Sequence, residues 1–181
     1  MPSIKDLKKR IGTVKNTQQT TRAMKMVSAA KLRRAQEAIT NQRPYAKSVN
    51  ELIRLVSTLA EGPIESPLVR ADEPAEGARK LLLVVVTSDR GLCGGFNASI
   101  IKATQRWLTA SQAGYASVRL AYVGKRGYDF FKGRKVGQGE NYSELGGKVT
   151  FTKAKKLADA LVKLYVDGEV DEVKFIYNEF K

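Results

Sequence analysis

The chain of 181 residues contains no histidine and a single cysteine, Cys93. Without histidine it lacks the usual general base near neutral pH and the commonest metal ligand in proteins. One cysteine permits no disulfide within the chain and suits a reducing compartment. No apolar stretch reaches the roughly 18 residues that a membrane-spanning helix needs, and no apolar signal segment follows Met1. We therefore predict a cytoplasmic protein that binds no metal through histidine.

Glycine is absent from residues 13–61, and Pro44 is the only proline there. Ser3 and Asp6, three residues apart, form a capping-box pattern that marks the start of a helix. The pattern predicts one long helix over residues 3–60, about 85 Å at 1.5 Å per residue. At Pro44 we expect a kink or local unwinding because the ring removes a backbone hydrogen bond. The alternative is two shorter helices joined at Pro44.

Apolar and small residues recur along this helix every 3.5 positions, over about eight heptads. One column of this seam holds Ile4, Ile11, Gln18, Lys25, Leu32, Ile39, Ala46, Ile53 and Ala60. The other column holds Leu7, Val14, Thr21, Ser28, Ala35, Gln42, Val49 and Val56. Such a seam is buried only against another helix, so the sequence predicts a coiled coil that needs a partner helix.

The seam has a gap over residues 17–31, where its positions are polar or small. Polar seam residues weaken a coiled coil but fix its register, and small ones let two backbones approach closely. Met24 and Met26 add adaptable apolar surface to the same segment. Two interpretations stay open: ordinary coiled-coil irregularity, or a segment where the partner's geometry changes or a third body contacts the pair.

Acidic residues are scarce in the first third of the chain. Residues 1–60 hold 13 Lys/Arg and 3 Asp/Glu, a net charge of +10, whereas the rest of the chain contributes +4 to the total of +14. A basic rod is expected to seek an acidic surface, either nucleic acid or an acidic protein cavity.

The second part of the chain has a different pattern. Residues 61–80 are rich in proline and glycine, which exclude regular structure and predict a linker. Short apolar runs predict strands at residues 81–87, 118–123 and 173–180. Helices are expected at residues 97–111, capped by Asn97, at 124–131 and at 152–166, and a loop or edge strand at 133–147. This alternation predicts an open, mostly parallel, Rossmann-like α/β domain over residues 81–181.

The glycine cluster of residues 91–97 lies where α/β proteins bind phosphates, between the first strand and its helix. It matches neither GxGxxG nor GxxxxGK[ST], so we interpret it as a tight exposed loop. Cys93 has no histidine to act as its base, and Ser88 with Asp89 lacks the third member of a triad. The carboxylates show no metal-ligand spacing. We predict a non-catalytic chain without a cofactor.

Three segments resemble the γ subunits of F-type ATP synthases: IKDLKKRIGTVKNTQQTTRAMKMVSAAKLRRAQ from residue 4, RPYA at 43–46, and VVTSDRGLCGGFN at 85–97. The resemblance covers the whole chain, and MKMVSAAK and SDRGLCGGFN are specific to that family. It implies a central stalk whose N-terminal helix pairs with a C-terminal helix inside a ring of three α and three β subunits. Rotation of the c ring by proton flow would then bias each catalytic β site in turn.

The resemblance also implies a place for individual residues. Those expected to face the α/β ring are Met24, Lys25, Met26, Arg33, Arg34, Gly91, Leu92, Cys93, Gly94 and Gly95. Those expected at the foot, near the ε subunit and the c ring, are Arg43, Pro44 and Tyr45. The implied location is the cytoplasmic face of the inner membrane of a bacterium, with the mitochondrial inner membrane as the alternative. Because γ subunits continue into a C-terminal helix, we expect this chain to lack that helix.

Two functions of other classes remain as alternatives. A basic coiled-coil dimer could bind nucleic acid, although its basic residues would then be expected to precede the seam instead of running along it. A nucleotide-using α/β enzyme with a coiled-coil arm would be indicated by nucleotide affinity of the second domain.

Overall fold

The computed structural model describes residues 3–60, 62, 64–69, 74–75, 77–134, 139–142 and 149–180. The chain divides into two compact units, a helical unit (Met1–Ile64) and an α/β unit (Glu65–Lys181). Of the predicted linker, residues 61, 63, 70–73 and 76 lie outside the described residues, and the described ones before Lys80 form turns and irregular backbone.

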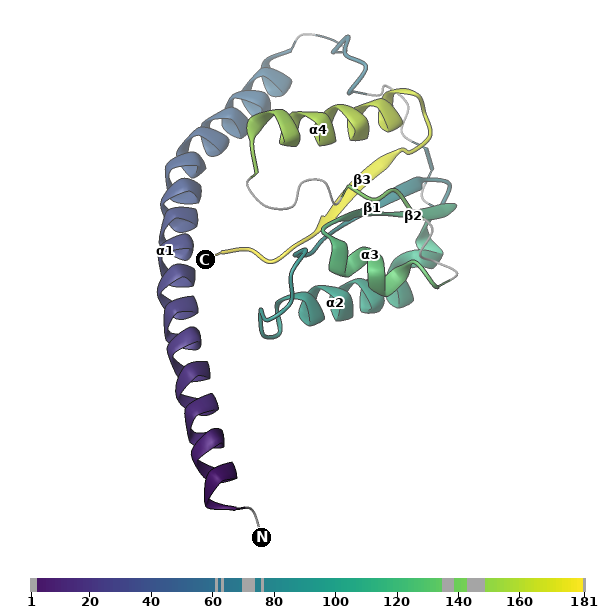
Figure 1. The fold of residues 1–181 in the computed structure, drawn as a ribbon. Helices are drawn as coiled ribbons and strands as arrows, with labels where there is room; N and C mark the ends of the chain where they lie inside the picture. The colour runs from purple at the N-terminus through teal and green to yellow at the C-terminus, as the bar shows by residue number, and fades with distance from the viewer. Residues whose placement is uncertain are drawn as a thin grey trace. The chain divides into compact units, whose positions relative to one another are not determined.

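Helix α1 (Ile4–Leu59) makes up the helical unit, and the capping box predicted at its start is confirmed. Ser3 Oγ accepts a hydrogen bond from Asp6 N, and the Asp6 carboxylate accepts one from Ser3 N, both at 3.2 Å. The single helix predicted to continue through Pro44 is confirmed and the alternative of two helices is wrong, because α1 passes Pro44 as one curved ribbon without local unwinding (Figure 1). One missing donor costs a single hydrogen bond, which the turns on either side outweigh.

The α/β unit contains a parallel sheet of three strands, which confirms the predicted fold class. Strands β1 (Lys80–Val86), β2 (Ser117–Val123) and β3 (Glu172–Ile176) lie in the order β2-β1-β3. In the register of the sheet, Leu83 of β1 lies opposite Leu120 of β2 and Lys174 of β3. The central strand β1 is therefore bonded on both edges, which suits its unbroken apolar sequence.

Helices cover both faces of this sheet, as Figure 1 shows. Leu81, Leu83 and Val85 pack against helices α2 (Phe96–Ser111) and α3 (Lys125–Phe131). Leu82 and Val84 point the opposite way, toward helix α4 (Phe151–Val166). A short 3-10 turn, η1 (Gln112–Gly114), follows α2. The alternation of β1 side chains between two cores is the period of two expected of a strand.

The start of α2 and the end of β3 differ from the sequence prediction. Asn97 does not cap α2, which begins one residue earlier with Gly95 as its N-cap, because the Asn97 side chain bonds the preceding loop instead. Strand β3 ends at Ile176, and residues 177–180 leave the ladder. The predicted loop or edge strand at 133–147 is described only in part; within it, Asn141 forms an isolated parallel bridge with Tyr122.

Tyr122 provides a prediction of pH dependence. Its ring is fully buried between Tyr128 and Phe131, and burial, followed by the charge of Tyr128, raises its pKa to about 12. In the unfolded chain the Tyr122 hydroxyl has its ordinary pKa of about 10. The stability that comes from keeping this hydroxyl protonated in the folded state is therefore complete below pH 10 and is lost as the pH rises toward 12. In urea unfolding at pH 8, 10 and 11.5, Tyr122→Phe is expected to flatten the alkaline fall of stability. An identical fall in both proteins would contradict this.

Candidate functional site

The seam of α1 is exposed at every position except Val49, which is half-buried. No residue of α1 is buried, and Leu32, at a seam position, is 58% exposed. An amphipathic stripe of this length is stable in water only when a second helix covers it. Helix α1 therefore presents a binding surface for a helix.

The positive charge of α1 is not neutralised within the helix. Asp6 is engaged in the capping box, and the other two acidic residues form i,i+4 pairs, Arg33 with Glu37 at 2.9 Å and Lys47 with Glu51 at 3.7 Å. Arg34 has no ion pair among the described residues. Since exposed pairs of this kind contribute little energy, the basic surface remains available to an acidic partner.

The gap in the seam presents less polar surface than its sequence suggests. The hydroxyls of Thr17, Thr20 and Thr21 each donate a hydrogen bond to the carbonyl four residues earlier, at 2.8–3.0 Å. A hydroxyl bonded to its own helix leaves mainly the methyl group for contacts with a partner. Met24 and Met26, both exposed, extend this surface. The gap therefore combines small side chains with two flexible methionines, which suits a contact that must adapt to its partner.

The three residues predicted for the foot also lie on α1. Pro44 is inside the helix and Tyr45 is 76% exposed, so its ring is free to contact a partner. Arg43, Pro44 and Tyr45 directly precede the Lys47–Glu51 ion pair on the same exposed helix.

The loop between β1 and α2 holds the other predicted contact residues, and Asn97 fixes its shape. The Asn97 carboxamide accepts a hydrogen bond from Ser88 N at 3.0 Å and donates to the Arg90 carbonyl at 3.4 Å. It also donates to Cys93 Sγ at 3.1 Å. One side chain thus ties together the start, middle and end of the loop.

The tip of this loop is fully exposed. Leu92 is 99% exposed and has a φ of 59°, a value that a leucine rarely adopts, and Gly94 follows with a φ of 56°. A leucine held in water and in the left-handed region costs free energy that nothing in the described residues offsets. The whole Leu92 side chain is therefore accessible to another molecule at the tip of the loop.

The edge where parallel α/β sheets usually bind nucleotides is occupied by the chain itself. Strands β1 and β3 are neighbours in the sheet, so their carboxyl ends meet at the edge where parallel α/β sheets usually bind ligands. There the Asn178 side chain donates to the Phe96 carbonyl at 3.2 Å, in the first turn of α2. This hydrogen bond joins the segment after β3 to the start of α2.

Nothing in the described residues builds a catalytic or metal site. Cys93 is exposed, and its sulfur contacts Asn97 and the Arg90 carbonyl, neither of which is a base. No group of three or more carboxylates or cysteines is placed to hold a metal ion. The same part of the chain includes no helix that combines the length and the apolar character needed to cross a bilayer.

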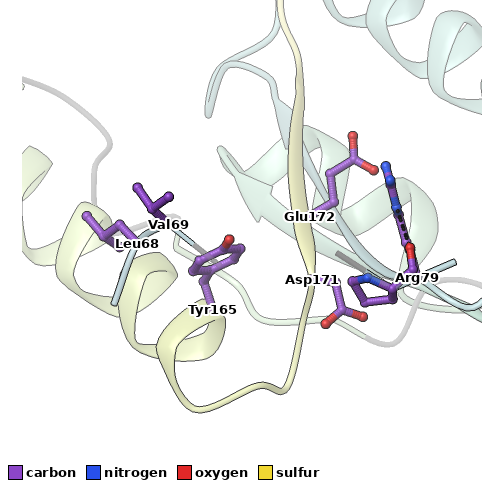
Figure 2. Close-up of a pocket in the computed structure, with 7 residues that line it drawn as sticks. Leu68, Val69, Arg79, Tyr165, Asp171 and Glu172 are labelled. Carbon is purple, nitrogen blue, oxygen red and sulfur yellow. Dashed lines mark hydrogen bonds between the residues drawn. The ribbon is translucent and has the colours of Figure 1, made fainter. Parts of the chain in front are cut away.

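A hollow of about 320 Å³ lies at the opposite end of the sheet (Figure 2). It is lined by Leu68, Val69, Pro74, Arg79, Tyr165, Asp171 and Glu172. Asp171 accepts a hydrogen bond from Lys80 N at 2.8 Å, which joins the starts of β1 and β3. The polar residues of this hollow hold strand ends in place, at the edge where parallel sheets do not usually bind ligands.

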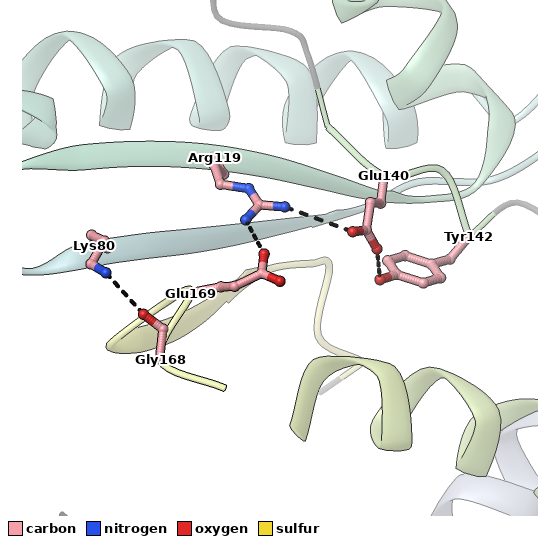
Figure 3. A network of polar contacts seen from close by, with 6 residues as sticks. All are labelled: Lys80, Arg119, Glu140, Tyr142, Gly168 and Glu169. Atoms are coloured by element: carbon pink, nitrogen blue, oxygen red, sulfur yellow. Dashed lines mark hydrogen bonds and ion pairs between the residues drawn. The ribbon is translucent and has the colours of Figure 1, made fainter. Parts of the chain in front are cut away.

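Figure 3 shows a second cluster of polar residues whose contacts hold parts of the α/β unit together. Arg119 of β2 pairs with Glu169 at 2.8 Å and with Glu140 at 3.7 Å. Lys80 Nζ donates to the Gly168 carbonyl at 2.9 Å. These contacts fasten the turn before β3 and the segment beside β2 to the sheet.

Sequence reasoning missed the residues that support the exposed loop from α3. Lys125 N donates to Asp89 Oδ1 at 2.9 Å, and Arg126 N donates to the Ser88 carbonyl at 3.2 Å. The sequence could have indicated this contact. The loop of residues 88–95 follows one predicted strand and Gly124 follows another, and the carboxyl ends of parallel strands meet at one edge of a sheet.

Comparison with known proteins identifies the family. A family model described as ATP synthase matches residues 3–181. An ATP synthase gamma chain from Geobacter metallireducens is 45% identical over 181 residues, and one from Trichlorobacter lovleyi is 43% identical over the same length. One from Chlorobaculum tepidum is 42% identical over 184 residues. Each match includes the whole of this chain, which spans only 61–62% of the relatives' length.

Proposed function

The chain belongs to the ATP synthase gamma-chain family, and on that premise we propose that it is part of the central stalk of the F1 sector. In this role it is a non-catalytic subunit that couples rotation of the membrane c ring to conformational change at the catalytic β sites. The observation that carries the proposal is α1: 56 residues of uninterrupted helix with an exposed seam and an unneutralised basic surface.

The partner helix of the seam is proposed to lie in the part of the relatives' length that this chain does not span. No other described helix is long enough to cover α1. Helices α2 and α4 have 16 residues each, about 24 Å, whereas α1 has 56 residues, about 84 Å. The two paired helices would form an asymmetric shaft.

The mechanism needs no reactive group on the stalk. A shaft that makes different contacts with three chemically identical sites shifts the populations of their conformations, by as much as the contact energies differ.

The ring is proposed to contact two parts of the chain. On α1 these are Met24, Lys25 and Met26, with Arg33 and Arg34 seating the rod among acidic surfaces. On the α/β unit they are Gly91, Leu92, Cys93, Gly94 and Gly95. Two observations support this assignment. In the seam gap the threonine hydroxyls bond to their own helix and Met24 and Met26 are exposed, and at the loop tip Leu92 is exposed.

The foot of the stalk is proposed to include Arg43, Pro44 and Tyr45, near the ε subunit and the c ring. The other partners are the α and β subunits. The proposed location is peripheral, at the cytoplasmic face of a bacterial inner membrane. The exposed Tyr45 side chain supports a contact at this level of α1.

Reversing the charge of Arg33 and Arg34 tests the proposal. Arg33→Glu with Arg34→Glu in the full-length subunit is expected to lower ATP-driven proton pumping several-fold relative to ATP hydrolysis. The reason is that two positive charges would be replaced by two negative charges, which the acidic surfaces of the partner would repel. The measurement is the ratio of the two rates in membrane vesicles.

The matched control is Lys47→Glu with Arg54→Glu, which makes the same charge change farther along α1. If the ratio is unchanged for both pairs, the two arginines have no part in coupling.

A further inference from the structure

Asn97 lies in the first turn of α2 but does not cap that helix. The N-cap is Gly95, and no side chain makes a capping hydrogen bond there. The Asn97 side chain is half-buried, whereas every residue from 90 to 96 is exposed. Its carboxamide turns back to the loop between β1 and α2 and bonds to residues at both ends of it. A side chain that could support its own helix therefore supports the preceding loop instead.

The carboxamide of Asn97 makes hydrogen bonds through both its oxygen and its nitrogen. Oδ1 accepts from Ser88 N at 3.0 Å, and Nδ2 donates to Ser88 Oγ at 2.9 Å and to Cys93 Sγ at 3.1 Å. The Ser88 hydroxyl in turn donates to the Arg90 carbonyl at 2.7 Å. An amide has one oxygen and two hydrogens to bond with, so this side chain uses its whole capacity within the loop.

The tip of this loop needs support from outside its own side chains. Leu92 has a φ of 59° and is 99% exposed, so no packing of the leucine holds its backbone in that conformation. The hydrogen bond from Lys125 N to Asp89 Oδ1 holds the start of the loop from α3. The bonds of Asn97 reach both the start of the loop and Cys93, beyond the tip.

We propose that Asn97 is a positioning residue for coupling, which holds the loop in the shape that another subunit contacts. The inference rests on the proposed function, which places this loop against the ring of α and β subunits. Asn97 acts through the loop, since its carboxamide is bonded within the chain. A loop that is already ordered loses less conformational entropy on contact, so loosening it weakens the contact without removing a contacting side chain.

Asn97→Asp separates this role from support of the helix. The carboxylate keeps an acceptor for Ser88 N but has no hydrogen to donate to Ser88 Oγ or Cys93 Sγ. A negative charge in the first turn of α2 favours the helix through its dipole, so the urea midpoint of the full-length subunit is expected to shift by less than about 0.3 M. Backbone amides of residues 88–95 are expected to exchange hydrogen at least about fivefold faster, because the loop opens more often.

The functional measurement is the ratio of ATP-driven proton pumping to ATP hydrolysis in membrane vesicles. Asn97→Asp in the full-length subunit is expected to lower this ratio about threefold or more. Ser88→Ala, which removes the hydroxyl between Asn97 and the Arg90 carbonyl, is expected to lower it in the same direction. Combining the two substitutions is expected to lower it little further, because both act on one network of hydrogen bonds.

The matched control is Ala98→Asp, which puts the same charge on the next residue of α2. Ala98 is exposed, and the loop hydrogen bonds do not involve its side chain. This variant is expected to change the exchange rates and the pumping ratio by less than about 1.5-fold. Equal effects of Asn97→Asp and Ala98→Asp would overturn the proposal, because the charge alone would then explain them.

The remaining outcomes separate the positioning role from the proposed function. If the wild-type subunit supports no ATP-driven pumping in the assembled complex, the proposed function fails. If it does, and Asn97→Asp leaves the pumping ratio unchanged although the loop amides exchange faster, only the positioning role fails. Unchanged exchange of the loop amides in Asn97→Asp would also overturn the positioning role, since the loop would then keep its shape without the carboxamide.

Discussion

Leu32→Asp in the full-length subunit is expected to lower the free energy of unfolding by about 3 kcal/mol or more, because a charge would replace an apolar side chain in the seam between two helices. Leu32 is 58% exposed in this chain, where the seam has no partner among the described residues. The expected loss therefore depends on the second helix. It is measured by denaturant unfolding of the full-length subunit, followed by helical circular dichroism.

The matched control is Val27→Asp, in the same helix but off the seam. Val27 is 55% exposed, so within α1 alone the two substitutions meet nearly the same surroundings. The control is expected to cost less than about 1 kcal/mol, which is typical of a surface substitution on a helix. Equal losses for the two variants would mean that no helix pairs along this seam.

Gly124→Ala is expected to destabilise the α/β unit by about 3 kcal/mol or more. Gly124 has a φ of 99°, and a Cβ there would lie 2.1 Å from the Thr87 carbonyl oxygen and 2.6 Å from its carbon. No side-chain movement relieves a clash with backbone, so the start of α3 must separate from Thr87. That separation would also break the hydrogen bond from Gly127 N to Thr87 Oγ1, at 2.8 Å. Denaturant unfolding measures the loss.

Two other glycines separate the causes of this effect. Gly168 has a φ of 72° but open space around it, so Gly168→Ala measures backbone strain alone and is expected to cost about 1 kcal/mol. Gly133 has open space and no unusual φ, so Gly133→Ala is expected to change stability by less than about 0.5 kcal/mol. A loss at Gly124 no larger than that at Gly168 would show that the close approach to Thr87 is unimportant.

The architecture could be predicted from the sequence where a local pattern and the tertiary contacts agree. The apolar run of β1 indicated a strand buried on two faces, and Leu81 and Leu82 do point into separate cores. The helix continues through Pro44, as predicted, and shows no local unwinding there, because the many other turns of a 56-residue helix outweigh the lost hydrogen bond and the ring clash at one proline. The prediction that Asn97 caps α2 was wrong. An asparagine side chain that can cap a helix can also bond a loop, and only the tertiary structure decides between the two.

The candidate site was predicted less completely than the fold. The loop tip was recognisable from its glycines, but the sequence does not show that Leu92 is the residue left in solvent. The partnership of this loop with Lys125 and Arg126 depends on a contact across more than 30 positions of sequence, made by the edge that β1 and β2 share. Charge counting, in contrast, identified the basic surface of α1 directly.

The most direct test of the stalk assignment is a mild-detergent purification of the tagged native protein from membranes, with every co-purifying subunit identified by mass. The account predicts recovery of α, β and ε subunits together with ATPase activity. Recovery of nucleic acid, or of a homodimer alone, would contradict it, and the basic helix would then need a different partner.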